Sequence, residues 1–513
     1  MAGQTRLWRS SDRWQFAARG PGATALLISP PVYDTQYWSQ WSQPYGLLRI
    51  AALLRQRGYK RVWLYDFLEP DPQRRVEQHR ISFQESYAEQ DRPDGPPRPC
   101  VIRKGHERLE LNWWHFGKSW EDFDAWIRQR GLHRSRQPDE VWISSVMTYW
   151  WESTRDLIAR CRRYFPKARI ILGGIYPTLA PQHAARYCQP DVVVAGELPE
   201  ANNLWTDLSL YDRPPTYAII TPGRGCPFNC AYCGQRAING GARGVRFRHP
   251  DDIVAEMKDK ADRYGIRDFA FYADFLLWRW PEYILPVLDA LAASRQQYHW
   301  RLYAPEGLDT RLLSQDRRLL DAMKAAGFQK LYLPVESIDD RYLAMLNRRH
   351  VKLEHFVKAL ELCQQAGFRL RNLEVNAFVL YGLPREKIDH VVKTILFVSE
   401  VCGSIIPMLF APVPSSALYK QWLPWFRQRG WHRRLEMLNG KLYPFLEVNE
   451  GGIEDYIDLQ RLMFTLNQHF RSKSFQIFSR AKVSRAFLDN LRNGFEDFVR
   501  QFTADSPNLS PPT

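Results

Sequence analysis

The sequence predicts an α/β fold: a doubly wound, Rossmann-like parallel-sheet domain, then a partial (β/α)6 barrel, then a helical C-terminal extension. Three observations lead to this prediction. Short apolar runs alternate with helical patterns twice along the chain. The runs are apolar throughout, as expected for strands that are covered on both faces. The chain has 513 residues, too many for one ordinary core, and 45% of them are apolar, which is typical of a globular protein.

The first alternation contains five apolar runs separated by helical patterns. After the first run, a periodic stretch from Pro44 to Arg57 stops at Gly58, as a helix that ends on glycine does. In a doubly wound sheet, ligands bind at the carboxyl ends of the strands. The predicted strands are 24–29, 61–66, 140–146, 168–174 and 191–196.

An interruption at 67–138 divides this first alternation. Its first part, through 93–99, is rich in Arg, Gln, Pro and Asp and is predicted to be a mobile excursion. Its second part, from Trp113 to Trp126, carries enough aromatic residues to be ordered. Within it, His115 is either an acid, base or ligand that reaches a cavity, or a histidine satisfied inside an aromatic cluster, and the second interpretation is favoured.

The second alternation predicts six strands, with a helix after each of the first five. Between the first two strands, Pro250 suits the first turn of a helix and Gly265 its C-terminal stop. The two further units that would close an eightfold barrel are missing, so the barrel is partial. The predicted strands are 216–221, 268–274, 299–305, 330–337, 373–382 and 404–412.

These patterns divide the chain into three predicted domains. They are the first sheet domain at 1–210 with its insertion at 67–138, the partial barrel at 211–420, and a helical region at 421–513 that ends in a disordered tail. The first residues lack the apolar core of a secretory signal, and no stretch reaches the ~18 consecutive apolar residues of a membrane span. A soluble, cytoplasmic protein with no membrane partner is expected.

The net charge of +15 leaves room for a nucleic-acid partner. The basic residues occur in short clusters, at 128–136 and 427–434, and there is no long polybasic run, so nucleic-acid binding is not favoured. Five of the eight cysteines are scattered without a pairing rhythm, which is typical of a reducing compartment.

The other three cysteines, Cys226, Cys230 and Cys233, lie within eight positions directly after the first barrel strand. A structural zinc site needs four ligands, and the nearest downstream histidine is His249. Three thiolates in one tight loop can instead hold three irons of a [4Fe–4S] cluster and leave the fourth iron open. The carboxyl end of a barrel strand is also where α/β barrels place their active sites.

The spacing Cys226-x3-Cys230-x2-Cys233 after such a strand resembles the radical S-adenosylmethionine (radical SAM) superfamily, over about residues 215–415. The resemblance implies a cluster whose open iron binds SAM, and an electron donor such as flavodoxin or ferredoxin. The reduced cluster cleaves SAM to a 5′-deoxyadenosyl radical, which abstracts hydrogen from an unactivated carbon. A structural zinc site or an unrelated iron–sulfur site is the alternative.

Further positions resemble the SAM-binding motifs of this superfamily. For each, ordinary strand-end chemistry is the alternative. Two departures stand out: only Asp274 is retained where the family keeps an acidic or glycine-rich motif for the SAM amino group, and Arg385 replaces a glycine. The SAM-binding positions implied by the resemblance are Tyr232, Asp274, Glu336, Ser337 and Gly382.

A doubly wound domain before such a barrel resembles the cobalamin-binding class of the superfamily. Many cobalamin domains supply a histidine ligand to cobalt after the first strand, but 32–46 contains no histidine. Six aromatic residues could shield that face of the cofactor, or pack the domain interface: Tyr37, Trp38, Trp41, Tyr149, Trp150 and Trp151. The resemblance implies cobalamin contacts at Pro31, Ser144, Ser145, Gly173, Gly174, Gly196 and Glu197.

These resemblances imply a cobalamin-dependent radical SAM enzyme, with a methyltransferase acting on an unactivated carbon of a small molecule as the leading interpretation. The first alternative is an enzyme of this architecture that forms rings, rearranges or oxidises without methyl transfer. An RNA-modifying enzyme and a non-enzymatic cluster or cobalamin sensor are the others. The domain could also have kept its fold and lost cobalamin. No motif identifies the substrate.

Overall fold

A computed structural model of the chain describes residues 5–9, 21–37, 41–69, 98–402 and 404–472. The chain divides into two compact units. The first unit comprises Met1–Val101, Glu110–Asp274 and Pro412–Asn439, and the second comprises Ile102–Leu109, Phe275–Ala411 and Gly440–Thr513. The domain boundaries at 210 and 420 stay predictions.

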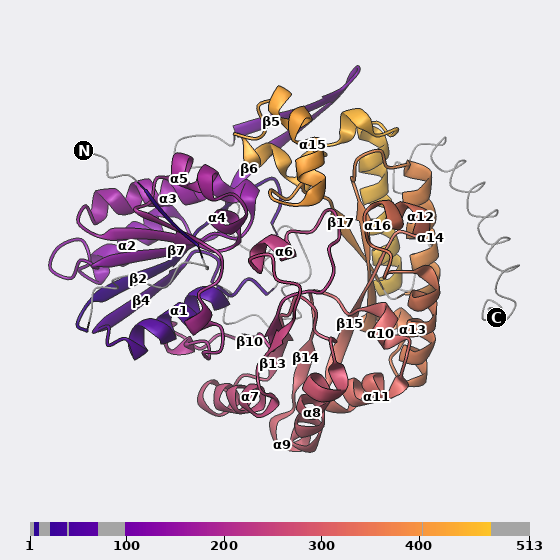
Figure 1. The fold of residues 1–513 in the computed structure, drawn as a ribbon, viewed down its shortest axis with the longest axis horizontal. Coiled ribbons are helices and arrows are strands. Elements are labelled where there is room, and N and C mark those ends of the chain that lie inside the picture. The colour runs from indigo at the N-terminus through magenta and orange to yellow at the C-terminus, as the bar shows by residue number, and fades with distance from the viewer. Residues whose placement is uncertain (1–4, 10–20, 38–40, 70–97, 403, 473–513) are drawn as a thin grey trace, which may run out of the picture. The chain divides into compact units, whose positions relative to one another are not determined.

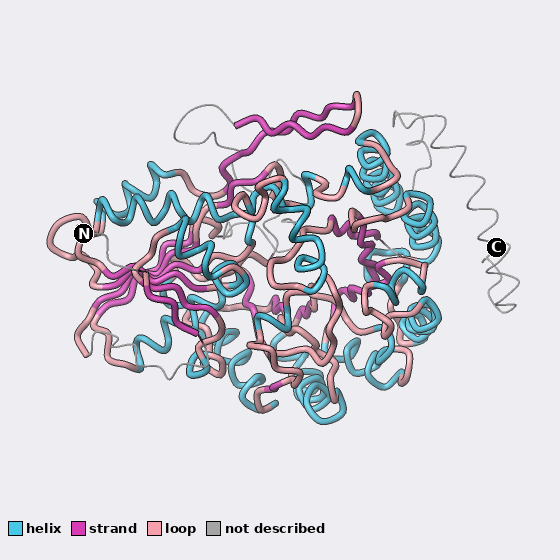
Figure 2. The backbone as a smooth tube through the Cα atoms, turned by 45° about the horizontal axis from the view of Figure 1, so that its top comes forward, coloured by secondary structure: helices cyan, strands magenta, loops and turns pink. Residues whose placement is uncertain are grey.

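A six-stranded parallel sheet forms the centre of the first unit, and Figure 2 shows its twist. All five predicted strands are confirmed, and a sixth, β1, adds to the edge beside β9. The strand order is β1-β9-β8-β7-β2-β4, so the order reverses between β2 and β7. The strands are β1 (Arg6–Arg9), β2 (Thr24–Ser29), β4 (Arg61–Asp66), β7 (Glu140–Ser144), β8 (Arg169–Gly173) and β9 (Val192–Ala195).

Helices cover both faces of this sheet, with α1 on one face and α3 and α5 on the other (Figure 1). Helix α1 buries Leu47, Leu48 and Ala51, which are spaced at three to four residues and so lie on one side. Burial of both faces explains why the strands are apolar throughout. The helices are α1 (Tyr45–Gln56), α2 (Trp120–Gln129), α3 (Trp151–Tyr164), α4 (Ile175–Leu179) and α5 (Pro181–Cys188).

The second part of the interruption is ordered, as predicted. Strands β3 (Val32–Asp34), β6 (Glu107–Phe116) and β5 (Arg98–Lys104) form a small sheet, and Figure 2 shows β5 and β6 as two long paired strands. His115 is 1% exposed, and its Nε2 lies 2.9 Å from the carbonyl oxygen of Lys118. Its ring packs edge-on against Trp120. The interpretation of a satisfied histidine is confirmed, whereas 70–97 lies outside the described residues.

The first two strands of the second alternation belong to the first unit. Strands β10 (Tyr217–Ile220) and β13 (Asp268–Phe271) pair in parallel and are joined through α7 (Pro250–Tyr264). As predicted, Pro250 is the first helical residue and Gly265 ends the helix at φ +70°. Between them lie β11 (Gly223–Arg224), α6 (Gln235–Ile238) and β12 (Arg246–Phe247).

The other four strands belong to the second unit and pair in parallel in chain order. With β10 and β13 they make up the six strands of the predicted partial barrel, so the fold class is confirmed. The strands are β14 (Arg301–Tyr303), β15 (Phe328–Glu336), β16 (Val375–Tyr381) and β17 (Ser404–Leu409). The helices are α8 (Trp280–Ala293), α9 (Arg295–Tyr298), α10 (Thr310–Leu313), α11 (Arg317–Ala326), α12 (Asp340–Met345), α13 (Leu353–Gln365), α14 (Ile388–Val401) and α16 (Ile453–Ser472).

The segment Pro412–Asn439 follows the last strand in the chain but packs within the first unit. It contains α15 (Ala417–Gln428) and a short 3-10 turn, Leu435–Leu438. Two side-chain bonds hold it there: the Trp151 indole donates to Glu436 at 2.9 Å, and the Asn439 amide donates to Asp34 at 2.9 Å. The predicted tail and the chain from 473 onward lie outside the described residues.

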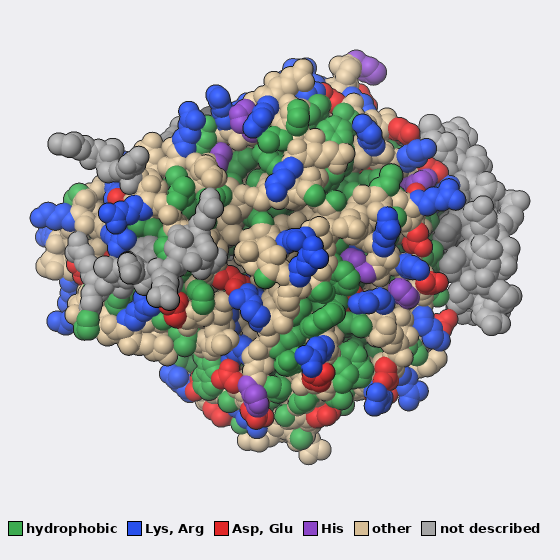
Figure 3. All heavy atoms as spheres, viewed as in Figure 1, with side chains coloured by type: hydrophobic (Ala, Val, Ile, Leu, Met, Phe, Trp, Pro, Cys, Tyr) green, Lys and Arg blue, Asp and Glu red, His purple; other side chains and the backbone are tan. Residues whose placement is uncertain are grey.

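Basic side chains outnumber acidic ones on the face drawn in Figure 3, in keeping with the net charge of +15. Among the described helices, none combines the length and the apolar character that crossing a membrane requires.

Candidate active site

A two-stranded ribbon closes the cysteine loop at its base. Strands β11 and β12 pair antiparallel, with Gly223 opposite Phe247 and Arg224 opposite Arg246. A Cβ at Gly225, whose φ is +106°, would lie 2.2 Å from the carbonyl oxygen of Gly244. Only glycine fits this backbone conformation and this close approach. The ribbon therefore brings the two ends of the loop together and confines the three cysteines between them.

Asp274, three residues beyond β13, binds the cysteine loop. It accepts hydrogen bonds from the Gly225 N–H at 2.6 Å, from the Asn239 amide at 3.2 Å and from the Gln235 amide. The Arg224 guanidinium lies 4.0 Å away. Asp274, which the sequence predicts to bind SAM, thus binds groups of the cysteine loop and holds that loop in shape. Sequence reasoning missed Gln235 and Asn239, because no motif marks them.

The two amides that bind Asp274 leave their own oxygens available. Gln235 Oε1 and Asn239 Oδ1 are buried, and each lacks a hydrogen-bond partner in the part of the chain that the structure describes. Buried acceptors of this kind are normally satisfied. Gln235 begins α6, two residues after Cys233, and Asn239 directly follows the end of this helix. These oxygens therefore fit a donor group of a ligand, such as an ammonium group.

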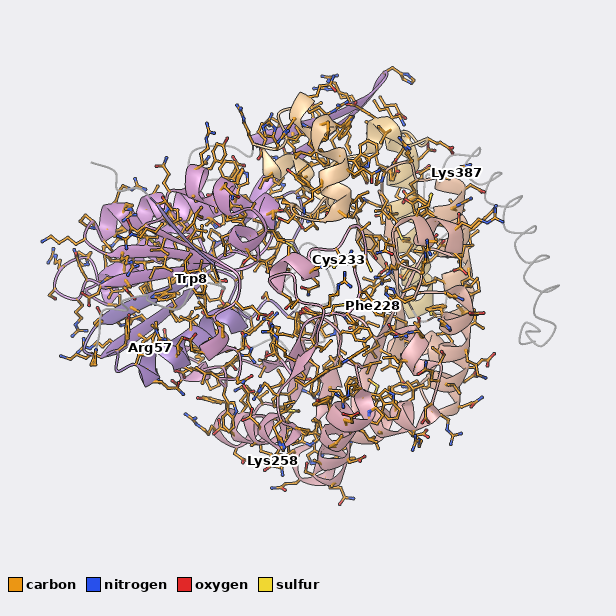
Figure 4. All side chains as sticks on the ribbon, viewed as in Figure 1. Trp8, Arg57, Phe228, Cys233, Lys258 and Lys387 are labelled. Atoms are coloured by element: carbon orange, nitrogen blue, oxygen red, sulfur yellow. The ribbon has the colours of Figure 1, made fainter. Side chains whose placement is uncertain are left out.

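The three cysteines are free thiols, with Cys230 buried and Cys226 and Cys233 half-buried. Figure 4 shows Phe228 and Cys233 in this loop. Burial raises the pKa of Cys226 to about 12, and the two neighbouring thiols add to the effect. Within the described ranges, no three His, Cys, Asp or Glu side chains gather as ligands of one metal ion do. Thiolates that bind separate irons of a cluster need not converge on one point.

The cysteine loop packs on the carboxyl edge of the first sheet. A Cβ at Gly234 would lie 2.8 Å from Val413 and 3.3 Å from Leu179, the last residue of α4. Arg246 of β12 donates to Glu197, two residues after β9, at 2.5 Å. The backbone N–H of Leu418 donates to the carbonyl oxygen of Ala231 at 2.7 Å. Loop, sheet edge and α15 thus form one packed region of the first unit.

Buried charges lie at the start of this loop and were not predicted. The Arg49 guanidinium donates to the Thr221 hydroxyl, and Arg248 donates to Glu256 at 2.6 Å. Burial lowers the pKa of Arg49 to about 10, with Glu256 opposing the shift and Arg224 adding to it. A buried cation is costly unless it is paired, so this network ties α1 and α7 to the strand that leads into the cysteines.

The predicted cobalamin residues follow neighbouring strands, and the structure brings them to one edge. Gly174 has φ +104°, and a Cβ there would lie 2.4 Å from the Ser145 carbonyl oxygen. The Ser145 N–H donates to the Gly173 carbonyl at 3.0 Å, and the Gly196 N–H donates to the Thr178 hydroxyl at 3.0 Å. Pro31 is buried between β2 and β3.

These residues are not equally available to a ligand. Ser145 is buried, and its hydroxyl accepts a hydrogen bond from Thr154 at 2.9 Å, so its side chain is internal. Ser144, Gly173, Gly174, Gly196 and Glu197 are half-buried. Glu197 Oε1 is buried and lacks a hydrogen-bond partner among the described residues, although Oε2 binds Arg246 and Asn202.

Two apolar side chains are exposed where the strand order reverses. Val146 and Met147 directly follow the Ser144–Ser145 pair after β7 and are 43% and 40% exposed. Exposed apolar side chains next to each other mark a candidate binding surface. Ligands of doubly wound sheets bind at such a reversal point, here between β2 and β7. The edge therefore fits a large cofactor with an apolar face.

The aromatic residues considered as shields of that cofactor are mostly packed inside the first unit. Tyr37 and Trp150 belong to a cluster with Val32, Leu68 and Phe116. Trp41 stacks edge-on against Tyr217. Trp151 is buried, Tyr149 is half-buried and Trp38 lies outside the described residues.

In the second unit, Glu336 is the last residue of strand β15 and Ser337 follows it. Glu336 is 9% exposed, adopts the left-handed conformation at φ +59° and accepts a hydrogen bond from Arg348 at 2.7 Å. Burial raises its pKa, and Arg348 opposes the shift. A left-handed glutamate stores backbone strain, which is typical of functional positions. The Ser337 hydroxyl accepts from the Asp339 N–H at 3.1 Å.

Gly382, also in the second unit, follows β16 at φ +86°. Its N–H donates to both carboxyl oxygens of Glu386, at 2.9 and 3.0 Å. The Tyr456 hydroxyl donates to the same carboxyl group at 3.2 Å. Burial raises the pKa of Glu386 to about 8, and the hydrogen bonds from Gly382 and Tyr456 limit the shift. The sequence assigned no role to Glu386.

Fold and site together define a class: an α/β-barrel protein with a three-cysteine loop after the first barrel strand, preceded by a doubly wound sheet domain. The family model described as Radical SAM superfamily matches residues 220–398. The matched residues include all three cysteines. The expected superfamily cofactors are a [4Fe–4S] cluster and SAM.

Several curated relatives are methyltransferases by name, and two of them are described here by their similarity to this chain. An uncharacterized methyltransferase, PH0819, of Pyrococcus horikoshii is 23% identical over 40% of this chain and 41% of its own length. The cytidylyl-2-hydroxyethylphosphonate methyltransferase of Streptomyces wedmorensis is 22% identical over 52% of this chain and 49% of its own length. The chain thus spans about half or less of these relatives.

One solved structure is similar over most of the chain. The radical S-adenosylmethionine methyltransferase TsrM of Kitasatospora setae, with cobalamin and a [4Fe–4S] cluster bound, matches with a TM-score of 0.54 at 14% identity. The match covers 77% of this chain and 74% of TsrM. At this identity the likeness establishes a common fold.

Proposed function

We propose that this protein is a cobalamin-dependent radical SAM enzyme that transfers a methyl group to an unactivated carbon of a small-molecule biosynthetic intermediate. The observation that carries the proposal is the packing of the cysteine loop on the carboxyl edge of the first sheet, through Gly234 against Leu179 and Arg246 against Glu197. A cluster site and a cofactor edge within one compact unit suit a reaction that uses both.

The bound cofactors would supply a carbon radical, from SAM and the cluster, and a methyl carrier, from cobalamin. The chain's part is to hold and orient them. Cys226, Cys230 and Cys233 would bind three irons, and Asp274 keeps their loop in shape through Gly225. The buried oxygens of Gln235 and Asn239 would accept hydrogen bonds from the SAM ammonium group. The contact between Asp274 and SAM that its sequence position implied stays a prediction.

The remaining SAM contacts are proposed on the family pattern. Tyr232 is half-buried next to Cys233 and would lie near the adenine, and Glu336, Ser337 and Gly382 end two strands of the second unit. Each of the last three already bonds its own chain, so their contacts to SAM would use the remaining lone pairs or the backbone.

Cobalamin would lie on the strand ends of the first sheet, over Val146 and Met147. The close turns at Gly173, Gly174 and Gly196 would let the corrin approach the backbone. Pro31, Ser144 and Glu197 border the same edge, and Ser145 supports it from inside. Since 32–46 carries no histidine, the lower face of cobalt would lack a histidine ligand from this loop.

The proposed substrate is a small molecule. The named methyltransferase relatives support a small-molecule substrate. A low-potential cluster also needs an electron donor such as flavodoxin or ferredoxin and exclusion of oxygen, which a reducing cytoplasm provides. The scattered free cysteines suit that compartment.

Anaerobic reconstitution with iron, sulfide and cobalamin tests the proposal. Under dithionite, we expect SAM to be cleaved and both 5′-deoxyadenosine and S-adenosylhomocysteine to accumulate. 5′-Deoxyadenosine alone would favour ring formation, rearrangement or oxidation without methyl transfer. No cleavage of SAM by a protein whose electron paramagnetic resonance spectrum shows the reduced cluster would refute the enzyme.

The cobalamin surface has its own test. The double variant V146E/M147E places two charges on exposed positions, so folding should be unaffected while cobalamin binding weakens at least tenfold. The control is M345E, since Met345 is a 74% exposed apolar residue in the second unit. Equal cobalamin binding by both variants, measured by absorbance after gel filtration, would contradict the assigned surface.

A further inference from the structure

The chain contains the same basic and aromatic motif twice, both times at a helix end. The sequences are WIRQRGLHR at 126–134 and WFRQRGWHR at 425–433. In the first, α2 ends before Gly131 at φ +66°, and in the second, α15 ends before Gly430 at φ +71°. The two copies therefore share both sequence and local geometry, and they can be compared position by position.

An arginine stacks on the motif's first tryptophan in each copy. The Arg130 guanidinium lies 4.6 Å from the ring centre of Trp126, and the Arg429 guanidinium lies 3.8 Å from that of Trp425. Stacking of this kind orders an arginine and keeps its charge at the surface.

Acidic residues accompany the first copy. Arg130 forms an ion pair with Asp212 at 2.7 Å, and α2 itself carries Glu121, Asp122 and Asp124. Asp124 binds Arg160 at 2.8 Å. Nearby charges of opposite sign cancel at distances beyond about a Debye length, so the first copy presents a weak field to a partner.

The second copy has no such compensation along the chain. From 412 to 435 there is no Asp or Glu, and this stretch carries Lys420, Arg427, Arg429, Arg433 and Arg434. Lys420, Arg427, Arg433 and Arg434 are exposed. The next acid, Glu436, is buried and already accepts hydrogen bonds from Trp151 and from Arg434. Since Glu436 compensates Arg434, we call the other exposed cations of this stretch, Lys420, Arg427 and Arg433, the α15 basic patch.

The α15 basic patch is joined directly to the cysteine loop. The Leu418 N–H in the first turn of α15 donates to the carbonyl oxygen of Ala231, which lies between Cys230 and Cys233. From Leu418 to Arg427 the helix rises by ~14 Å. The far end is held as well, because the His183 ring bonds the Arg433 carbonyl at 3.2 Å. The patch is therefore a fixed surface one short helix away from the predicted cluster.

We infer that the α15 basic patch is the docking surface for a small acidic electron-transfer protein that reduces the cluster. The inference rests on the proposed function, since it assumes a cluster in the cysteine loop. In the step it serves, the donor's flavin hydroquinone loses one electron and becomes a semiquinone, and the oxidised cluster gains that electron. Complementary charge speeds such an encounter and orients the partner.

Two features favour an acidic protein over a nucleic acid. The patch covers one short helix and its end, too small for the extended basic track that single-stranded RNA follows. The hydrogen bond from Leu418 to Ala231 keeps the patch close to the predicted cluster. This closeness matters for an electron donor but not for binding RNA.

The test compares charge reversals at matched positions of the two copies. R427E/R433E alters the α15 basic patch, and R128E/R134E makes the same change in net charge at the equivalent exposed positions of the first copy. Reduced flavodoxin is the probe. Its affinity for the reconstituted full chain is measured by anaerobic titration calorimetry at low and at high salt, and its rate of cluster reduction by stopped-flow absorbance.

We expect R427E/R433E to weaken flavodoxin binding and slow cluster reduction at least tenfold, and the control to change both less than twofold. High salt should weaken binding to the wild-type protein. The milder R427Q/R433Q should lie between the wild type and the reversal. Thermal melting checks that the variants fold, and dithionite should reduce their clusters to the same extent.

The inference is overturned if both reversals weaken flavodoxin binding equally, if neither does, or if the wild type does not bind flavodoxin. It is also overturned if R427E/R433E abolishes binding of a labelled single-stranded RNA while flavodoxin binding persists. Failure of the proposed function looks different: dithionite would then reduce the cluster without cleavage of SAM, whichever variant is used.

Discussion

Two carboxyl groups that follow strands, Asp274 in the first unit and Glu386 in the second, make the same kind of hydrogen bond but lie in different electrostatic surroundings. Each accepts a hydrogen bond from the backbone N–H of a glycine with positive φ, Gly225 or Gly382. Asp274 also faces Arg224 and two amides, whereas burial raises the pKa of Glu386 to about 8. Asp274, which faces a cation, holds the cysteine loop in shape. Glu386, which is buried and bound by neutral donors, can titrate near neutral pH.

The cysteines provide the largest expected contrast between the two units. C230S should abolish retention of the cluster, because Cys230 would bind one of its irons. C363S changes a buried cysteine of α13 in the second unit and should leave the iron content at the wild-type level. Iron and acid-labile sulfide per chain measure both. Loss of iron in C363S, at unchanged stability, would place the cluster elsewhere.

Replacing each of the two carboxyl groups by its isosteric amide should affect folding stability very differently. D274N replaces an acceptor oxygen by a donor that faces Arg224 and two amides, so we expect a loss of about 4 kcal/mol in folding stability and faster loss of iron to a chelator. E386Q removes a group already inclined to be neutral and should cost about 1 kcal/mol at pH 5, where the titration of Glu386 has lowered the stability of the wild type only slightly. Equal costs in urea denaturation would remove the distinction between the two carboxyl groups.

The raised pKa of Glu386 predicts how stability depends on pH. The folded state binds this proton up to about pH 8, and the unfolded chain releases it near 4.5. The contribution is therefore fully present below pH 4.5 and is lost as the pH rises to 8, with a magnitude of about 5 kcal/mol. The free energy of unfolding should fall over this range in the wild type.

E386Q is the control for this pH dependence, because glutamine does not titrate. Its free energy of unfolding should fall less between pH 5 and 8 than that of the wild type. Parallel pH profiles for the two proteins would mean that Glu386 is ionised in the folded state at neutral pH.

Substitution of Gly225 and of Gly382 by alanine should cost different amounts of folding stability, because the space around the two residues differs. A Cβ at Gly225 would lie 2.2 Å from the Gly244 carbonyl oxygen, whereas at Gly382 the nearest atom, the Phe410 nitrogen, is 3.7 Å away. We expect G225A to cost about 2–3 kcal/mol through overpacking and G382A about 1 kcal/mol through backbone strain alone. Thermal unfolding measures both, and a larger cost for G382A would contradict the close approach of Gly225 to Gly244 in the ribbon.

The smallest expected effect is that of removing the Tyr456 hydroxyl, which binds Glu386. Y456F removes the hydroxyl that donates to this carboxyl group at 3.2 Å. It should cost about 1 kcal/mol and shift the pH dependence of stability to higher pH, because a hydrogen bond that favours the ionised form is lost. A shift to lower pH would show that the hydroxyl acts differently.

The strands and the cysteine motif could be predicted from the sequence because their signals are local. Apolar runs such as TALLIS at 24–29 become buried strands wherever both faces are covered. His115 was correctly interpreted, since its aromatic neighbours adjoin it in sequence. The edge strand β1 was missed, because its short run RLWR mixes polar and apolar residues and is recognisable only beside β9.

The partners of Asp274 could not be predicted for a different reason. Gly225, Gln235 and Asn239 lie 35 to 49 positions before it in the chain, and no pattern connects them. The family motif assigned Asp274 to SAM, whereas the structure shows it bound by its own loop. The contact between Leu418 and Ala231 spans a still longer separation and was equally invisible.

The sequence by itself determined the order of strands and helices, the spacing of Cys226, Cys230 and Cys233, and the two copies of the basic motif, because each depends on neighbours along the chain. Only the tertiary structure decided which copy is compensated by Asp212, which carboxyl group meets Arg224, and which becomes buried enough for its pKa to rise to about 8. Electrostatic environment depends on burial and on distances in space, and residues far apart in the chain set both.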